Sequence, residues 1–433
     1  MTALIRKLLK HNLIQNIFAL YGVQFASYIF PLLTIPYLTR VLGPKEWGLV
    51  AFTQAFGQYM VLIVEYGFNL SATREIARFR DSVEKRSELL AGVIGAKLLL
   101  AFLSLVLALI ASRWITAFQE HPRLFWSGIF WAYAMAFNLM WYFQGLERMR
   151  LVAALDVGAK ALALVGIVLW VRIPQDGWKV LALMGAASVI SGLTALFLAY
   201  SEVPARLPNW RFSREALRLG WTMFLFRSAV SLYTVGNTFI LGLFVQPQIV
   251  GYYAGAEKIS KAFLGLLGPI TQAIYPRMSQ VARRSREEAA KLARAGIIAM
   301  GFGGVFIGVV VFASAPLLVR VLLGEGFQAA VPVLRILALL LPMIAISNVL
   351  GIQWMLPLGL DRPFNAIILS AGLINIILAL VLAPRYAHIG MAWSVVLSEA
   401  FATSCMYVFL HRREIDPFQY KKTHTGKVTN DES

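Results

Sequence analysis

Long apolar runs alternate with short polar stretches along the whole sequence. Each run has the roughly 17–25 residues that an α-helix needs to cross the hydrocarbon core of a bilayer. This pattern predicts an all-α integral membrane protein with twelve transmembrane helices. Their expected cores lie at residues 13–37, 47–68, 88–111, 124–143, 151–171, 179–200, 216–244, 249–275, 295–314, 331–356, 364–383 and 389–410.

Composition supports the membrane assignment. Of the 433 residues, 59% are hydrophobic and 14% are charged, and the mean hydropathy is +0.68. Soluble domains have about 45–50% apolar and about 25% charged residues. The first apolar run is too long for a signal peptide and lacks a small-residue cleavage site, so we expect it to be retained as the first helix.

The formal net charge of +18 would suggest a nucleic-acid partner if the protein were soluble. The placement of the basic residues indicates another reason for it. With a cytoplasmic N-terminus, 26 of the 40 lysines and arginines fall at inner helix ends and loops, nine at outer ones and five within helices. This positive-inside asymmetry predicts that both termini are cytoplasmic, that the chain contacts anionic membrane lipids, and that it has no nucleic-acid partner.

Two sequence repeats indicate homologous halves. VLGPKEWGLVA near the second expected helix matches FVQPQIVGYYA near the eighth, so that Pro44 corresponds to Pro247. GLER at 145–148 and GLDR at 359–362 occupy corresponding loops. Because six helices per half is an even number, both halves run in the same sense, and such halves typically enclose a site at their interface. The predicted parts are an N-terminal six-helix lobe at 1–200, a cytoplasmic linker at 201–215, a C-terminal six-helix lobe at 216–411 and a cytoplasmic tail at 412–433.

Five basic residues lie inside the expected helices. A rise of about 1.5 Å per residue puts all of them at a depth of about 13–18 Å, near the bilayer midplane. A lysine or arginine at that depth costs about 2.5–3.5 kcal/mol, so it usually faces a bundle interior or a water-filled cavity. Since both halves contribute, the pattern predicts a central cationic cavity that binds substrate. The five are Lys97, Lys160, Arg227, Lys258 and Lys261.

A structural alternative stays open for two of these lysines. Asp156 precedes Lys160 by four residues, and Glu257 precedes Lys261 by four, so each pair is spaced for an intrahelical ion pair. Glu399 has no basic residue one turn away. Such a carboxyl either carries a proton during transport or is held protonated by a hydrogen bond between helices. Glu399, Glu257 and Asp156 are therefore the candidates for ion coupling.

Several chemistries are missing from the sequence. It has no phosphate-cradling glycine loop, no HExxH and no Cys/His cluster at metal-binding spacing, and Cys405 is its single cysteine. The loops expected on the outer side are short. We therefore expect no cofactor, no metal site, no internal disulfide and no enzymatic activity. If the protein carries out uphill transport, an ion gradient has to drive it.

Four segments together resemble Wzx-type polysaccharide flippases, bacterial members of the multidrug/oligosaccharidyl-lipid/polysaccharide flippase superfamily. They are PLLTIPYLTRVLGPKEWGLVAF (31–52), YGFNLSATREIAR (66–78), GYYAGAEKIS (251–260) and AIYPRMSQ (273–280). The resemblance covers nearly the whole chain. It implies two six-helix lobes that form a V around a central cavity, which opens alternately to each side of the membrane.

The resemblance also implies a substrate and a location. The substrate is expected to be an undecaprenyl-diphosphate-linked oligosaccharide, moved from the cytoplasmic to the periplasmic leaflet of the bacterial inner membrane during O-antigen and lipopolysaccharide biosynthesis. A glycan polymerase and a chain-length regulator are the expected protein partners. Two rival functions stay open. A cation or drug antiporter of the same superfamily is disfavoured by five basic against three acidic residues near the midplane. A membrane-embedded glycan polymerase or ligase is disfavoured because the expected outward loops are short.

Overall fold

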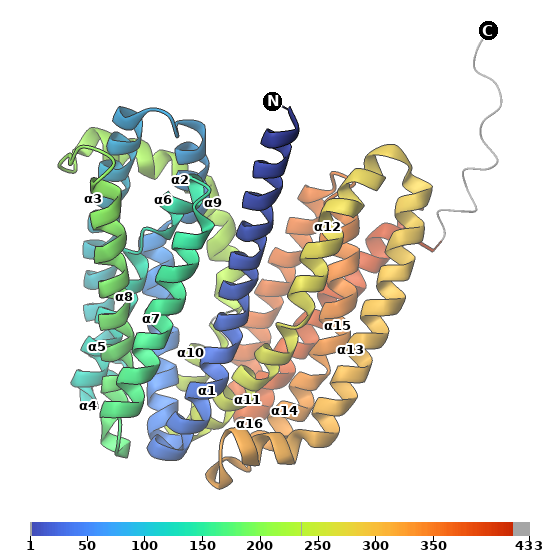
Figure 1. The fold of residues 1–433 in the computed structure, drawn as a ribbon. Helices are drawn as coiled ribbons and strands as arrows, with labels where there is room; N and C mark the ends of the chain where they lie inside the picture. The colour runs from blue at the N-terminus through green and yellow to red at the C-terminus, as the bar shows by residue number, and fades with distance from the viewer. Residues whose placement is uncertain (1, 235, 419–433) are drawn as a thin grey trace. The chain divides into compact units, whose positions relative to one another are not determined.

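The computed structural model describes residues 2–234 and 236–418 (Figure 1). For residues 2–29, 31, 32, 222, 223, 225–234, 269, 272 and 273 it describes the backbone but not the side chain. All regular elements in the described ranges are helices, which confirms the predicted fold class. The chain divides into two compact units, Met1–Ser231 and Leu232–Ser433. This boundary lies later in the chain than the predicted linker at 201–215, and the predicted lobe limits stay predictions.

The N-terminal unit contains eight α-helices, one 3-10 turn and most of a ninth helix, within the described residues. The elements are α1 (Thr2–Glu65), α2 (Phe68–Arg78), α3 (Val83–Trp114), α4 (Thr116–Glu120), α5 (Pro122–Ala136), α6 (Met140–Gly145), α7 (Met149–Trp170), η1 (Pro174–Asp176), α8 (Gly177–Tyr200) and α9 (Trp210–Thr234). In α1, Gly43 has φ 70° and ψ 174°, so the helix is kinked there. A positive φ is tolerated by glycine because it has no Cβ. The kink separates the first two predicted membrane helices.

The C-terminal unit is built in the same way, from long helices and short connections. Its elements are α10 (Asn237–Gly242), α11 (Pro247–Leu264), α12 (Leu267–Arg284), α13 (Arg286–Leu322), the 3-10 turn η2 (Glu325–Phe327), α14 (Ala330–Ala338), α15 (Leu340–Ser347), the π-helical η3 (Asn348–Met355) and α16 (Asp361–Arg412). Ala387 (φ 50°, ψ −132°) interrupts α16 and separates the last two predicted membrane helices.

Local sequence signals explain where several helices begin. Ser82 and Ser285 lie just before α3 and α13, and each side chain accepts a hydrogen bond from the backbone N–H three residues later. This N-cap satisfies one of the free N–H groups of the first turn. Pro44 follows the Gly43 kink and Pro247 is the first residue of α11. Proline is well suited to a helix start, so the two prolines aligned by the repeat have the same local role.

Seven helical ranges are long and apolar enough to cross a membrane, among the described residues. Two of them are Leu33–Arg78, with 46 residues, and Asp361–Arg412, with 52 residues. The first is interrupted at Gly43 and the second at Ala387. Twelve crossings stay a prediction. Exposed side chains on these helices are mainly apolar, for example Phe102, Phe197 and Phe306. A surface of this kind suits contact with lipid.

Close helix packing holds the N-terminal unit together. At Gly185 on α8, an added Cβ would lie 2.7 Å from the ring of Phe130 on α5. Only a residue without a side chain allows this approach, because real Cβ atoms essentially never come that near. A second contact region lies where α2 packs against α6 (Figure 1). Its core contains Phe68, Ile76 and Tyr142, all fully buried.

Candidate functional site

Two helices of the N-terminal unit are interrupted near each other. The first interruption lies between α1 and α2, where Tyr66 and Gly67 have φ values of 47° and 76°. The second lies between α5, which ends at Ala136, and α6, which begins at Met140. The hydroxyl of Thr73 on α2 donates a hydrogen bond to the main-chain oxygen of Trp141 on α6 (3.1 Å). Each interruption leaves carbonyl groups without helical partners, and in an apolar environment these groups need other donors.

Lys97 supplies such a donor. It lies on α3, its residue is 3% exposed, and its Nζ donates to the main-chain oxygen of Ala136 (2.6 Å) and, more weakly, to that of Asn138 (3.5 Å). A cation at the C-terminal end of a helix is favoured because the last carbonyls carry partial negative charge. The structure thus gives this predicted site residue a defined partner at the end of α5.

Lys97 lines a pocket of the N-terminal unit. Its empty volume is about 1120 Å³. Three of the predicted site residues line it, namely Lys97, Asp156 and Lys160, together with Glu65. The remaining polar lining residues are Asn69, Asn138, Gln144 and Ser188. The structure therefore brings together, inside one unit, residues that are far apart in the sequence.

The charges in this pocket are balanced. Lys160 Nζ lies 2.5 Å from the Asp156 carboxylate on the same helix, which confirms the ion pair expected from their spacing. Glu65 lies close enough to Lys97 to interact with it electrostatically. Two acids and two bases in one pocket keep the net charge low, and partly buried charges are tolerated when they are paired in this way.

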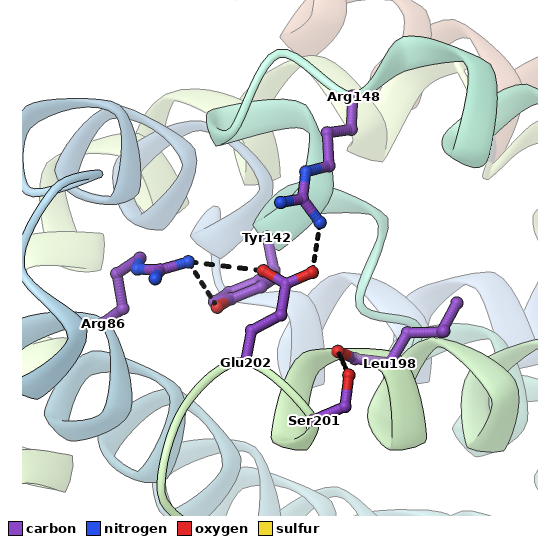
Figure 2. Close-up of polar contacts among 6 residues, drawn as sticks. All are labelled: Arg86, Tyr142, Arg148, Leu198, Ser201 and Glu202. Carbon is purple, nitrogen blue, oxygen red and sulfur yellow. Dashed lines mark hydrogen bonds and ion pairs between the residues drawn. The ribbon is translucent and has the colours of Figure 1, made fainter.

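A network of ion pairs lies at the start of α3 (Figure 2). Glu202, just after α8, accepts from Arg86 Nη1 (3.5 Å) and from Arg148, which precedes α7. The same Nη1 of Arg86 donates to the hydroxyl of Tyr142 on α6 (3.3 Å). One carboxylate thus connects the ends of three helices. Through Tyr142 on α6, the network also contacts the segment that follows the second helix interruption.

In the C-terminal unit, the predicted site residues of α11 form a second set of contacts. Lys261 Nζ lies 3.0 Å from the Glu257 carboxylate, which confirms the second expected ion pair. Thr238 at the start of α10 donates to the other oxygen of Glu257 (3.1 Å). Lys258 is partly buried on the same helix. The acidic group is therefore shared between an ion pair within the helix and a hydrogen bond to a neighbouring one.

Glu399 has a partner on another helix. The hydroxyl of Ser347, at the end of α15, donates to Glu399 Oε1 (2.7 Å). Ser347 directly precedes the π-helical segment Asn348–Met355. Segments of π-helix occur frequently at functional sites. The interhelical hydrogen bond expected for this carboxyl is therefore present, and its role in ion coupling stays a prediction.

The fifth cation, Arg227, lies on α9, and its side chain is outside the described residues. The other four divide between the units, with Lys97 and Lys160 in the first, and Lys258 and Lys261 in the second. Their assignment to a single substrate-binding cavity stays a prediction.

Sequence reasoning did not single out several polar residues that shape the N-terminal pocket. These residues are Glu65, Asn69, Asn138 and Gln144, which all line the pocket. A signal was present, because each of these residues interrupts an apolar run close to an expected helix end. Arg86 and Glu202 gave no such signal, since both lie outside the expected membrane helices, where most charged side chains are solvated.

Comparison with known proteins identifies the family. Residues 13–282 match the family described as "Polysaccharide biosynthesis protein". A protein from Escherichia coli (strain K12) named "Putative O-antigen transporter" is 33% identical over 414 residues, which cover 94% of this chain and 98% of that protein. One of the same name from Shigella dysenteriae is 30% identical, with 92% and 98% covered. The chain therefore belongs to the polysaccharide biosynthesis protein family, and its resemblance to Wzx-type flippases is confirmed.

Solved structures support the fold. "Lipid II flippase MurJ, inward closed conformation" aligns with a TM-score of 0.72 at 13% identity, covering 96% of this chain and 94% of that one. An inward-facing multidrug resistance MATE family transporter of the MOP superfamily aligns with a TM-score of 0.63 at 16% identity, covering 91% and 96%. At such low identity the likeness concerns the fold alone. The protein has the helical fold of this transporter superfamily.

Proposed function

We propose that this protein moves an undecaprenyl-diphosphate-linked oligosaccharide from the cytoplasmic to the periplasmic leaflet of the bacterial inner membrane. The family concerns polysaccharide biosynthesis, and two relatives are named as O-antigen transporters. A membrane transporter of polysaccharide precursors is the function that these relationships support. The lipid carrier, the direction and the coupling ion are our proposal.

One observation carries this proposal: membrane helices of both units retain lysines with specific partners. Lys97 contacts the end of α5, and Lys160 and Lys261 form ion pairs with acids on their own helices. A lysine at the bilayer centre costs about 2.5–3.5 kcal/mol, so lysines within the predicted membrane helices favour a role with a charged or polar substrate. A diphosphate is the group on the proposed substrate that cations attract most strongly.

We assign ion coupling to three carboxyl groups that have polar partners in the structure. Glu399 accepts from Ser347, and Glu257 is shared by Lys261 and Thr238. Asp156 pairs with Lys160 in the N-terminal pocket. A proton or cation that binds one of these carboxylates would release its partner, which links ion binding to local helix contacts. Alternating access of two six-helix lobes, with both termini cytoplasmic, completes the proposed mechanism.

The proposal includes partners at the same membrane. The lipid tail of the substrate stays in the bilayer while its polar head crosses, so membrane lipids surround the protein throughout transport. A glycan polymerase and a chain-length regulator are proposed to receive the product on the periplasmic side. The chain itself is proposed to catalyse no covalent reaction, in keeping with the transporters among its relatives.

The test measures which leaflet of the membrane holds the lipid-linked repeat units. In a strain that lacks the gene, lipid-linked repeat units are exposed to a glycan-modifying enzyme supplied only from the periplasmic side. We expect the units to accumulate out of reach of this enzyme and to become accessible when the intact gene is restored. Units that accumulate but are accessible would place the block after translocation, and would favour a polymerase or ligase.

A further inference from the structure

The first turns of α9 carry a stripe of arginine and tryptophan that the proposed transport cavity does not use. Arg211, Arg214 and Arg218 are separated by three and four residues, so they project from one face of the helix. Trp210 and Trp221 lie at the two ends of the same face and are 65% and 51% exposed. This stripe is accordingly both cationic and aromatic along its whole length.

The opposite face of α9 is firmly packed, so the stripe has a fixed orientation. Ser213, Ala216 and Gly220 are buried. A Cβ added at Gly92 of α3 would lie 2.7 Å from the main-chain oxygen of Phe212, and one added at Gly220 would lie 2.8 Å from the ring of Tyr66. These close approaches hold α9 against α3 and the end of α1 within the N-terminal unit.

An open groove runs along the stripe. Its empty volume is about 1660 Å³, and its walls include the three arginines, both tryptophans and Tyr66. Tyr66 has a left-handed backbone (φ 47°), which is a genuine outlier for so bulky a residue. This conformation presents its ring to α9, where it stacks on Phe224 with ring centroids 4.5 Å apart. Strained residues of this kind cluster at ligand-binding sites.

The groove carries excess positive charge. Glu215 is its one acidic lining residue, against three arginines. In the part of the chain that the structure describes, no ion pair involves Arg211, Arg214 or Arg218. Unlike Arg86 and Arg148, whose guanidinium groups share Glu202, these three are free to bind an external anion. Arginine binds phosphate oxygens through two parallel hydrogen bonds.

We propose that this groove is a docking site for the diphosphate headgroup of a lipid-linked glycan in the cytoplasmic leaflet. This inference rests on the proposed function, including the predicted cytoplasmic position of residues 206–218. Arg218 lies seven positions after Arg211, about 10 Å along the helix axis. This length exceeds that of a single phosphate and suits a diphosphate with its first sugar. The aromatic rings at the groove supply flat apolar surfaces against which a sugar ring packs. A bulk phospholipid offers no sugar for these rings.

The test is a binding measurement on the purified full chain in detergent micelles. Undecaprenyl diphosphate that carries one sugar is titrated, and cardiolipin, which carries two phosphates but neither a sugar nor a polyprenyl chain, is titrated in parallel. We expect the triple variant Arg211→Gln/Arg214→Gln/Arg218→Gln to bind the undecaprenyl ligand about tenfold or more weakly, because charge-assisted hydrogen bonds are lost. The single variant Arg214→Gln is expected to lose less affinity. It keeps the test valid if the triple variant does not fold.

A matched control removes equal charge elsewhere. Arg283→Gln/Arg284→Gln/Arg286→Gln changes three exposed arginines at the α12–α13 junction, and we expect it to bind like the unaltered chain. Unchanged binding by both stripe variants would overturn the proposal. The proposal would also be overturned if the unaltered chain bound cardiolipin as tightly as the undecaprenyl ligand and the stripe variants lost both. The groove would then be a site for bulk anionic lipid.

The binding result separates this site from the proposed function. If the unaltered chain binds the undecaprenyl ligand through the stripe but lipid-linked glycans still reach the periplasmic leaflet without the gene, the docking site stands and the transport proposal fails. If transport requires the gene while the stripe variants bind and transport normally, the transport proposal stands and the docking site fails.

Discussion

The ammonium group of Lys97 lies 2.6 Å from the main-chain oxygen of Ala136, at the end of α5. This contact joins a lysine on one helix to an interruption in another, next to a pocket that also contains Glu65, Asp156 and Lys160. It gives Lys97 a structural role that is separate from any contact with substrate. The two roles can be distinguished by experiment.

Replacing Lys97 by methionine tests the structural role. We expect Lys97→Met to lower the free energy of unfolding by about 1–3 kcal/mol, because the carbonyl of Ala136 loses its donor in a buried place. Thermal unfolding of the purified protein in detergent measures the change. Lys291→Met is the control, since Lys291 forms an exposed pair with Glu287, and removing such a pair costs less than about 1 kcal/mol. Equal effects of the two substitutions would contradict the assignment.

The Asp156–Lys160 pair should be coupled more strongly than an exposed pair of the same spacing. A double-mutant cycle with Asp156→Asn and Lys160→Gln is expected to give an interaction energy of about 0.5–2 kcal/mol, because the pair is partly buried in the pocket. The same cycle on Glu287 and Lys291, also four residues apart and well exposed, should give about 0.3–0.5 kcal/mol. Identical coupling energies would show that the pocket does not strengthen the pair.

The Glu202 network should matter for stability in a way that an exposed pair does not. Glu202→Gln leaves both Arg86, which is largely buried, and Arg148 without a carboxylate, so we expect a loss of about 1–3 kcal/mol in the free energy of unfolding. The control Glu147→Gln removes only an exposed ion pair, in which Arg80 Nη1 lies 3.6 Å from the Glu147 carboxylate. This control should change the free energy of unfolding by less than about 0.5 kcal/mol. If the Glu202 variant is as stable as the control, the network does not contribute to the stability of the protein.

Glu399→Gln tests ion coupling without disturbing packing. Glutamine keeps an oxygen that accepts from Ser347 but cannot take up a proton, so we expect a folded protein whose transport no longer responds to an imposed proton gradient. Ser347→Ala, which keeps the carboxyl, should retain the response. The measurement is transport into vesicles with and without the gradient. A full response in Glu399→Gln would exclude this residue from proton coupling.

Much of the fold follows from the sequence because lipid imposes simple rules. The long apolar runs predicted an all-helical fold, and the spacing of Asp156 to Lys160 and of Glu257 to Lys261 predicted two ion pairs. The structure confirms these features. These features depend on local spacing alone. The prolines aligned by the repeat, Pro44 and Pro247, are likewise both placed at helix starts.

The helix interruptions could not be predicted in the same way. A membrane helix is apolar on every face that meets lipid, so its pattern does not show where the backbone departs from the helix. The interruption at Tyr66 and the one after Ala136 depend on contacts with other helices, among them Lys97. The arrangement of Arg86, Arg148 and Glu202 is also set by tertiary packing, because these residues come from three separate loops and helix ends.

The most direct test of the central claim uses the purified chain in lipid vesicles that contain undecaprenyl-diphosphate-linked oligosaccharide. A glycan-modifying enzyme is added outside only, and the fraction of oligosaccharide that it modifies is measured over time. We predict that vesicles with the protein give nearly complete modification, while protein-free vesicles stop once the outer leaflet is exhausted. If both kinds of vesicle stop at the same fraction, the protein does not translocate this substrate and the account is wrong.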